Sequence, residues 1–162
     1  MSKLALCLWF DNQAEAAANF YVDAFRSCGQ PASLGSVLYY GENAPQPKGS
    51  VLTITCILAG QEIICLNGGP HYQLSPAMSL FVKCADQPEV DRFWETLLED
   101  GGKPVQCGWL TDRFGVSWQI VPTVLLDMLH DLNDARAQRA MQAMMQMVKL
   151  DVAALQRAYD GG

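Results

Sequence analysis

Hydrophobic and polar positions follow the same order twice along the chain. Apolar runs at residues 4–10, 33–40, 50–58 and 61–67 predict strands, and a helical pattern fills residues 12–28. The second half repeats this order with shorter loops, with strands at 79–84, 103–110 and 116–121 and a helix over 86–100. We therefore expect an α+β fold of two β-α-β-β-β modules that form a curved mixed sheet, with the helices outside and a concave inner face.

The predicted helices begin and end alike in the two halves, which supports a duplication. Asn12 with Glu15, and Asp86 with Glu89, have the spacing of a capping box at a helix start. Each helix then runs into glycine, a residue common at helix ends. An aromatic pair follows each cap at a similar distance, and the offset between the halves is roughly 74 residues. The matched pairs are Phe20-Tyr21 with Phe93-Trp94, and Cys28-Gly29 with Gly101-Gly102.

The last 40 residues or so predict a helical tail instead of a third module. Residues 122–132 and 135–149 have helical periodicity, and Asp151 is placed as an N-cap between Leu150 and Leu155, which could form a hydrophobic staple. We therefore expect a two-module domain at 1–122, with modules at about 1–70 and 77–122, and a tail at 123–162. One face of the second helix is apolar and suits core or subunit packing: Ala137, Ala140, Met141, Met144, Met145 and Val148.

Composition narrows the possible partners and the location of the protein. The net charge is −6 and no basic run occurs, so a nucleic-acid partner is not expected. No apolar stretch approaches the roughly 20 residues of a membrane helix. The N-terminus does not have the pattern of a signal peptide, so we expect a cytoplasmic protein.

Six cysteines are distributed without a metal-binding pattern. No two are spaced as CxxC, and the chain has only two histidines, His71 and His130, so a clustered Cys/His zinc site is not expected. Most of the cysteines lie in apolar runs, which favours reduced thiols in the core. Cys65 or Cys107 could still serve as a nucleophile, although neither has a histidine partner nearby in the sequence.

Five stretches resemble the PhnB-like family, which is often labelled after demethylubiquinone methyltransferase. They are LWFDNQAEAAANFY (8–21), GQEIICLNGGP (60–70), SLFVKCAD (79–86), DRFGVSWQIVP (112–122) and AMQAMMQMVKLDVAAL (140–155). The paired modules resemble the vicinal oxygen chelate superfamily, which contains this family together with glyoxalase I, extradiol dioxygenases, and bleomycin- and fosfomycin-resistance proteins. The resemblance implies the glyoxalase/bleomycin resistance fold, a homodimer, and one divalent metal held by His and Glu ligands on the concave face.

The same resemblance places the four ligand positions at residues that bind metals poorly. The first falls at Leu4 and the third at Ser79, while Gln119 takes the place of the final glutamate. The second falls at Cys65, with Asn67 or Ile63 as alternatives two residues away. Divalent metals prefer carboxylate, imidazole or thiolate ligands, so we expect no metal and no other cofactor. A shifted alignment, or His71 from a loop, is the alternative.

Strand alternation orients the predicted cavity. Leu80, Val82 and Cys84 would face the helix, as would Trp118 and Ile120, whereas Lys83, Val121 and the intervening polar residues would face the concave side. The candidate cavity residues are Leu6, Leu8, Cys65, Asn67, Ser79, Phe81, Ser117 and Gln119.

Several functions remain open from the sequence. Apolar walls with a few neutral hydrogen-bonding groups favour a protein that binds an uncharged or aromatic small molecule without a metal. An enzyme of unknown reaction and a homodimeric structural or interaction protein are the alternatives. The methyltransferase label has little support, because neither GENAPQPKG nor LNGGP lies in the strand–loop–helix context of a glycine-rich cofactor site.

Overall fold

The computed structural model describes residues 2–162, which divide into two compact units, 2–74 and 75–162. The first unit holds the first predicted module, and the second holds the second module together with the helical tail. None of the helices in this described part combines the length and apolar character needed to cross a bilayer.

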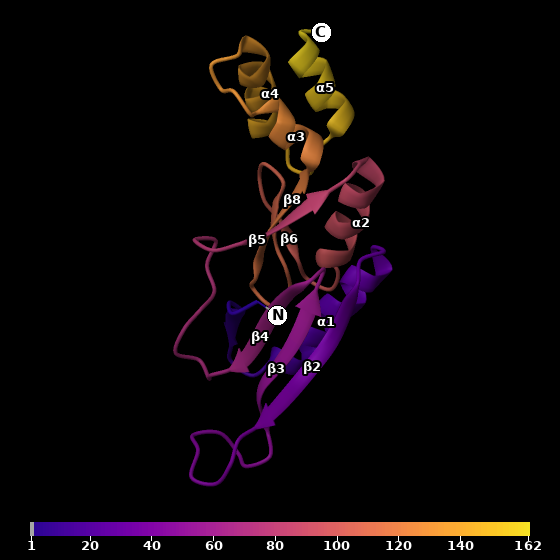
Figure 1. Ribbon diagram of the computed structural model, residues 1–162. Coiled ribbons are helices and arrows are strands. Elements are labelled where there is room, and N and C mark those ends of the chain that lie inside the picture. Colours follow the sequence, from indigo (N-terminus) through magenta and orange to yellow (C-terminus); the bar gives the residue numbers. More distant parts are fainter. Residues whose placement is uncertain (1) are drawn as a thin grey trace. The chain divides into compact units, whose positions relative to one another are not determined.

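The first unit is a four-stranded mixed sheet with one helix. Its elements are β1 (Leu6–Phe10), α1 (Ala14–Ser27), β2 (Ala32–Tyr39), β3 (Val51–Leu58) and β4 (Gln61–Asn67) (Figure 1). The strand order is β1-β4-β3-β2, with β1 and β4 parallel and the other neighbours antiparallel. The parallel pair requires a crossover, and α1 with β2 and β3 supplies it.

The second unit repeats this topology. Its module consists of β5 (Leu80–Cys84), α2 (Gln87–Leu97), β6 (Lys103–Pro104), β7 (Trp109–Thr111) and β8 (Ser117–Pro122). The strand order is β5-β8-β7-β6, and β5 and β8 are parallel. The predicted α+β class with duplicated β-α-β-β-β modules is therefore confirmed. The strand expected at 103–110 is in fact two short strands, because Cys107 and Gly108 have left-handed φ angles of 61° and 82° that interrupt it.

The two module helices begin in different ways, and only one start matches the prediction. Asp86 caps α2, since its Oδ1 accepts the Glu89 backbone N–H at 3.0 Å. The corresponding prediction for Asn12 was wrong: α1 begins at Ala14, and Gln13 at the N-cap makes no side-chain capping bond. Instead, Asn67 Oδ1 at the end of β4 accepts the Ala14 N–H at 2.8 Å. A residue of the sheet therefore replaces the local cap.

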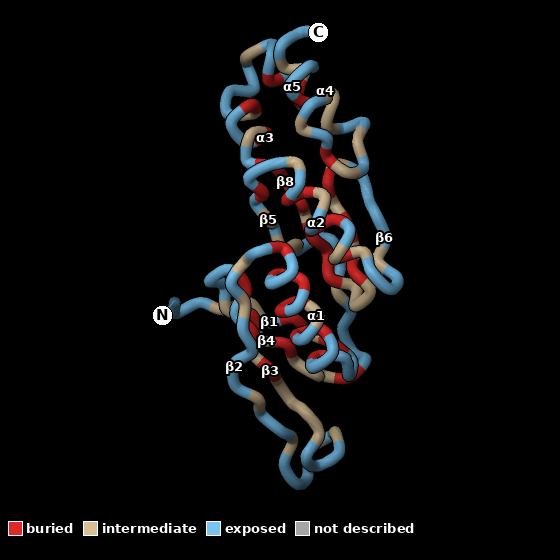
Figure 2. The backbone as a smooth tube through the Cα atoms, turned by 90° about the vertical axis from the view of Figure 1, so that its right-hand side faces the viewer, coloured by how far each residue is buried: buried red, intermediate tan, exposed pale blue. Residues whose placement is uncertain are grey.

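In β1, β3 and β4 the buried residues alternate with more exposed ones, and Figure 2 shows buried stretches in both units. In the first unit these residues are buried together with the inner face of α1, and the second unit has the same arrangement with α2. Because successive strand residues point to opposite sides, each sheet has a helix-covered face and a second face opposite the module's own helix. The buried residues that define the helix-covered faces include Leu8, Phe10, Ile63 and Cys65 in the first unit, and Leu110, Trp118 and Ile120 in the second.

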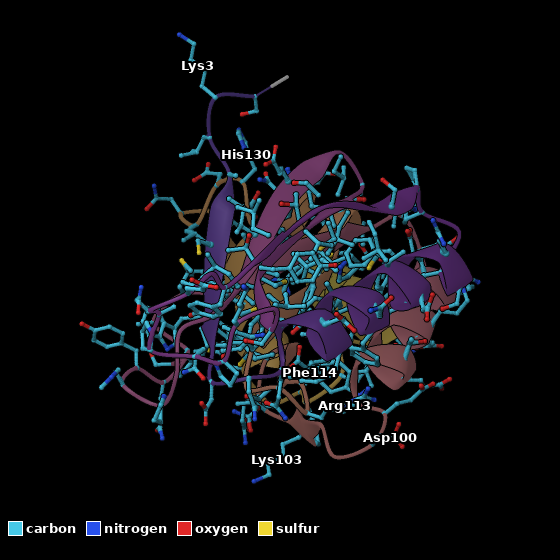
Figure 3. The ribbon with its side chains drawn as sticks, turned by 90° about the horizontal axis from the view of Figure 1, so that it is seen from below. Lys3, Asp100, Lys103, Arg113, Phe114 and His130 are labelled. Carbon is cyan, nitrogen blue, oxygen red and sulfur yellow. The ribbon has the colours of Figure 1, made fainter. Side chains whose placement is uncertain are left out.

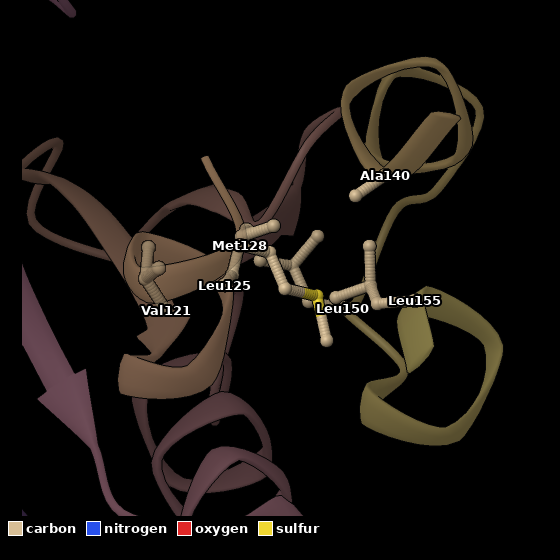
Figure 4. Close-up of a cluster of buried hydrophobic side chains, with 6 residues drawn as sticks. All are labelled: Val121, Leu125, Met128, Ala140, Leu150 and Leu155. Carbon is tan, nitrogen blue, oxygen red and sulfur yellow. The ribbon is translucent and has the colours of Figure 1, made fainter. Parts of the chain in front are cut away.

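The tail forms three helices: α3 (Thr123–Met128), α4 (Ala135–Met145) and α5 (Val152–Asp160). Asp151 caps α5 through the Ala154 N–H at 3.0 Å, as predicted. The helices enclose a hydrophobic cluster consisting of Val121, Leu125, Met128, Ala140, Leu150 and Leu155 (Figure 4).

Two predictions about this region were wrong. Val121 was expected to face a cavity, but it is buried in the cluster because the tail packs on the end of β8. Val148 was assigned to the apolar face of α4, but α4 ends at Met145, and both Met145 and Val148 are exposed.

Candidate functional site

The two polar residues predicted for the concave side of the second module lie next to each other. Gln119 Nε2 donates a hydrogen bond to Ser79 Oγ at 2.9 Å. Gln119 is on β8 and Ser79 immediately precedes β5, and both are half-buried. Alternation places Gln119 opposite the side on which Trp118 and Ile120 pack with α2, as the sequence predicted.

Two aromatic residues flank Gln119 on the same face. Phe81 on β5 is its register partner on one side, and Trp109 on β7 is its partner on the other. Register partners in neighbouring strands point to the same side of a sheet, so the three side chains form a row. Phe81 is 43% exposed, and Trp109 is half-buried. We call Ser79, Phe81, Trp109 and Gln119 the Gln119 face.

Trp109 was missed by the sequence analysis. A single strand from 103 to 110, as the sequence predicts, implies no register between Trp109 and Gln119. The strand is interrupted by a turn in which Cys107 and Gly108 both have left-handed φ angles. In the sequence, Gly108 is the only one of the two residues whose type indicates such a turn. A hairpin drawn from Gly108 onward would have paired the tryptophan with the glutamine.

A buried carboxylate fixes the turn between β7 and β8. Asp112 is 3% exposed, and it accepts hydrogen bonds from the backbone N–H groups of Phe114 and Val116 and from Trp118 Nε1, at 2.8, 3.0 and 2.8 Å. Three donors compensate the cost of burying its charge. The aspartate of DRFGVSWQIVP therefore has a structural task and is not free to act as a base.

The exposed side of this turn is tied to the rest of the module. Arg113 Nη1 lies 3.0 Å from Asp100 Oδ2, and the Arg113 guanidinium stacks over the Phe114 ring at 4.7 Å from its centroid (Figure 3). Asp100 is exposed, so this ion pair contributes little to stability. Both contacts nevertheless restrict the conformation of the loop that leads into Gln119.

The remaining candidates of the second module differ in access. Ser117 shares the side of Gln119 but is only 3% exposed, and it pairs with Thr111. Lys83 lies two residues after Phe81 on the same side of β5 and is exposed. Ser117 is therefore too buried to contact a ligand directly. Lys83 is the nearest cationic side chain to the Gln119 face along β5.

In the first unit the orientation of the candidates was predicted wrongly. Leu8 and Cys65 are register partners and are buried on the face that carries α1, and Leu6 shares the side of Leu8 by alternation. Asn67 also lies on this side, because its side chain caps α1. The residues on the opposite side of β1 and β4 are instead Cys7, Trp9, Ile64 and Leu66.

Cys65 is also unsuited to act as a nucleophile. It is 0% exposed, and a hydrogen bond with Cys56 together with burial raises the pKa of the Cys65 thiol well above its usual range. A thiol of this kind stays protonated and inaccessible. All six cysteines are free, and Cys7 is exposed.

A polar hollow of about 390 Å³ lies at the end of β4 in the first unit. Asn67 organises it: its Nδ2 donates to the Val51 carbonyl at 3.1 Å, its Oδ1 accepts the Ala14 N–H, and its backbone carbonyl accepts the Tyr40 hydroxyl. Because both polar atoms of its side chain already form hydrogen bonds within the protein, Asn67 acts here as a structural residue. The other lining residues are Asp11, Asn12, Glu15, Gln46, Pro47 and Ser50.

The residues at the expected metal positions do not fit a divalent ion. Leu4 is 75% exposed and has no metal-ligating atom in its side chain, and Cys65 lies beneath α1. Ser79 and Gln119 offer only neutral oxygens and are bonded to each other. Across residues 2–162 no group of three or more His, Cys, Asp and Glu residues has a metal-binding arrangement. A hard cation or zinc would need charged or imidazole ligands that this set does not provide.

Comparison with solved structures identifies similar chains. A structure described as a 3-demethylubiquinone-9 3-methyltransferase, PhnB protein, from Bacillus cereus is 33% identical, with a TM-score of 0.65, over 75% of this chain and 99% of that one. Protein PA1353 from Pseudomonas aeruginosa shares the fold at 20% identity and a TM-score of 0.60, over 75% of this chain and 98% of that one.

A more distant similarity is to a glyoxalase/bleomycin resistance protein from Albidiferax ferrireducens T118, at 13% identity and a TM-score of 0.48, over 72% of this chain and 95% of that one. No curated protein matches the sequence. The sequence profile of the 3-demethylubiquinone-9 3-methyltransferase family matches residues 2–121. This match covers most of the chain and agrees with the Bacillus cereus structure, so the chain belongs to the 3-demethylubiquinone-9 3-methyltransferase family.

Proposed function

We propose that the protein binds an uncharged, flat aromatic molecule on the Gln119 face, without a divalent metal. The observation that carries the proposal is the row of Phe81, Gln119 and Trp109, with Ser79 bonded to the amide. Two π surfaces on either side of a neutral hydrogen-bonding pair suit a planar ligand with a carbonyl, amide or hydroxyl group.

The polarity of this face favours a neutral ligand over a charged one. The amide and the hydroxyl can exchange their mutual hydrogen bond for bonds to a ligand, so no buried donor need be left unsatisfied. Neither group carries a charge that would offset the desolvation of an ionic ligand. Lys83 is the exception on this side of β5, and a matched anionic probe measures its influence.

Methyl transfer, which the family description names, has weaker support from this chain. A nucleotide-like methyl donor is usually held where a glycine-rich loop leads from a strand into a helix. Here Gly68 and Gly69 follow β4, and residues 70–79 contain no helix before β5 begins. An enzyme of another reaction class on the Gln119 face remains the alternative, with the same residues contacting the substrate.

Titration with 1-naphthamide and 1-naphthoate, followed by NMR of the backbone amides, tests the proposal. The two probes share one ring system and a similar shape but carry a neutral amide or an anionic carboxylate, and neither alkylates exposed thiols such as Cys7. We expect 1-naphthamide to shift the amides around Phe81, Trp109 and Gln119 and to bind more tightly than 1-naphthoate. Substitution Gln119→Ala should weaken binding about fivefold to tenfold, since it removes one hydrogen bond, whereas Gln61→Ala on β4 should change nothing. Equal binding by the Gln119→Ala variant would reject the proposal.

We also propose that the protein is a homodimer and lies in the cytoplasm. The dimer rests on the resemblance, and the edge strand β2 exposes Leu34, Leu38 and Tyr39, which is compatible with a further contact. Light scattering at micromolar concentration should give twice the chain mass of 17.8 kDa. A monomer would contradict the dimer without bearing on ligand binding.

A further inference from the structure

The helical tail lies beyond the residues that the family profile matches, although its stretch 140–155 resembles the family in sequence. The family profile ends at residue 121, and the Bacillus cereus structure is covered over 99% of its length by 75% of this chain. The tail nevertheless packs against the second module, because it shares a buried core with the end of β8 (Figure 4). An extension packed against the strand that carries Gln119 can influence the Gln119 face.

A chain of backbone hydrogen bonds connects the tail to this face. Met147 and Val148 accept the N–H groups of Cys107 and Gly108, both at 2.8 Å, and the Gly108 carbonyl accepts the Ile120 N–H at 2.8 Å. Gly108 directly precedes Trp109, and Ile120 directly follows Gln119. The tail therefore extends the hydrogen bonding of the sheet at the point where the two side chains are placed side by side.

The loop held by these bonds has an unfavourable backbone conformation. Cys107 has a φ of 61° although it carries a side chain, and Gly108 follows with a φ of 82°. Left-handed conformations of residues other than glycine persist where surrounding contacts impose them. The Met147 and Val148 carbonyls are such contacts, because they accept the N–H groups of these two residues.

Leu150 fills the space beside the same loop. A Cβ placed on Gly108 would lie 2.9 Å from Leu150 Cδ1, so the glycine and the leucine are in tight contact. Leu150 is 0% exposed and also packs in the cluster that contains Val121. Leu150 therefore lies against Gly108 and belongs to the same buried cluster as the end of β8.

The tail segment is anchored on its other side to α2. Gln87 Nε2 donates to the Leu150 carbonyl at 3.0 Å, and Gln87 Oε1 accepts the Val152 N–H at 2.7 Å. Lys149 Nζ lies 2.9 Å from Asp91 Oδ1. Residues 147–152 are thus clamped between the first turns of α2 and the loop before β7.

We propose that residues 147–152 are a positioning element that keeps Trp109 beside Gln119. The family fold supplies the strands, and the extension fixes the loop at residues 105–109 that determines where the indole lies. The ligand-binding consequence rests on the proposed function, whereas the positioning itself can be measured without ligand.

The test compares Leu150→Ala with Leu155→Ala in the full chain. Both leucines are 0% exposed in the same cluster, and the side-chain atoms nearest to the position of a Gly108 Cβ belong to Leu150. Protein containing 5-fluorotryptophan gives one ¹⁹F signal for each tryptophan, and Trp109→Phe assigns that of Trp109. We expect Leu150→Ala to move or broaden the Trp109 signal and to speed amide exchange of Gly108 and Ile120 about tenfold, the effect of weakening roughly one hydrogen bond. Leu155→Ala, at similar thermal stability, should leave these signals near their original positions.

Gln87→Met provides a second variant in case Leu150→Ala does not fold. Methionine keeps the volume of glutamine but removes both bonds to the tail, so it should change the Trp109 signal in the same direction with a smaller amplitude. An unchanged Trp109 signal in the folded variants, or an equal change in Leu155→Ala, would overturn the positioning role. If wild-type protein fails to bind 1-naphthamide while the ¹⁹F result holds, only the proposed ligand class is rejected.

Discussion

The side chain of Asn67 caps a helix that begins 53 residues earlier in the chain, through a 2.8 Å bond from the Ala14 N–H to its Oδ1. The same side chain donates to the Val51 carbonyl, so it joins α1, β3 and β4. Asn12, which has the sequence pattern of a local cap, does not form one.

Replacing Asn67 should therefore cost more than replacing Asn12. Asn67→Ala loses a helix cap and a second partly buried hydrogen bond, and we expect a decrease of about 2 kcal/mol in the free energy of unfolding. Asn12→Ala should stay within about 0.5 kcal/mol of wild type, as for other exposed positions. Urea unfolding followed by circular dichroism measures both. Equal effects of the two substitutions would contradict the cap from β4.

The bond between Gln119 and Ser79 should appear as a coupling energy. A double-mutant cycle with Gln119→Ala and Ser79→Ala isolates the pair, and we expect a coupling of about 0.5–1.5 kcal/mol because both groups are neutral and half-buried. Chemical unfolding of the four proteins gives the value. Strictly additive effects would mean that the bond does not persist in solution.

Asp112 should be among the most costly polar residues to remove. Asp112→Ala leaves two backbone N–H groups and the Trp118 indole N–H without their acceptor, and we expect a loss of about 3 kcal/mol or more. Thermal unfolding by calorimetry measures the change, and Asp127→Ala on the exposed side of α3 serves as the control. A loss as small as that of the control would contradict the role of Asp112 in the turn.

Asp134 should titrate at unusually low pH. Its hydrogen bonds with Arg136 lower the pKa of the Asp134 carboxyl to about 2, and its Oδ1 accepts the Arg136 N–H at the start of α4. The native pKa lies below the ordinary value of about 3.9, so the contribution to stability is present above pH 4 and is lost as the pH falls toward 2. Carbon-detected NMR of the carboxyl group measures the midpoint, and Arg136→Ala should return it toward the ordinary value.

Treatment with a metal chelator should change neither the stability of the protein nor its ligand binding. The oxygens of Ser79 and Gln119 carry no charge, so dialysis against EDTA should not alter the melting temperature or 1-naphthamide binding. Elemental analysis of purified protein should find divalent ions well below one per chain. One tightly held ion per chain would show that ligands from elsewhere in the molecule complete a site.

The sequence predicted the second module better than the first, and the reason lies in strand polarity. In β8, Gln119 lies between Trp118 and Ile120, so alternation shows which side is polar. In β4, both alternating sets are apolar, with Ile63 and Cys65 on one side and Ile64 and Leu66 on the other. The sequence of β4 therefore does not indicate which side α1 covers. The ligand positions implied by the family resemblance fell on the side that α1 covers, and not on the open side.

Contacts between distant segments account for the other differences. The cap from Asn67 and the burial of Val121 by the tail join residues with no local relation in the sequence. The position of Trp109 beside Gln119 could be predicted only from the pairing register of the three-residue strand β7. Periodicity predicts which elements form, but register and docking follow from packing across the fold.

The Asp112 turn also has a consequence for the chemistry of the sheet surface. By holding both the turn backbone and the Trp118 indole, Asp112 locks the β7–β8 hairpin in one register. A slip of a single residue would turn every β8 side chain over, placing Trp118 where Gln119 now lies and burying the amide beneath α2. The carboxylate thus determines indirectly whether the sheet presents an amide or an indole to a ligand.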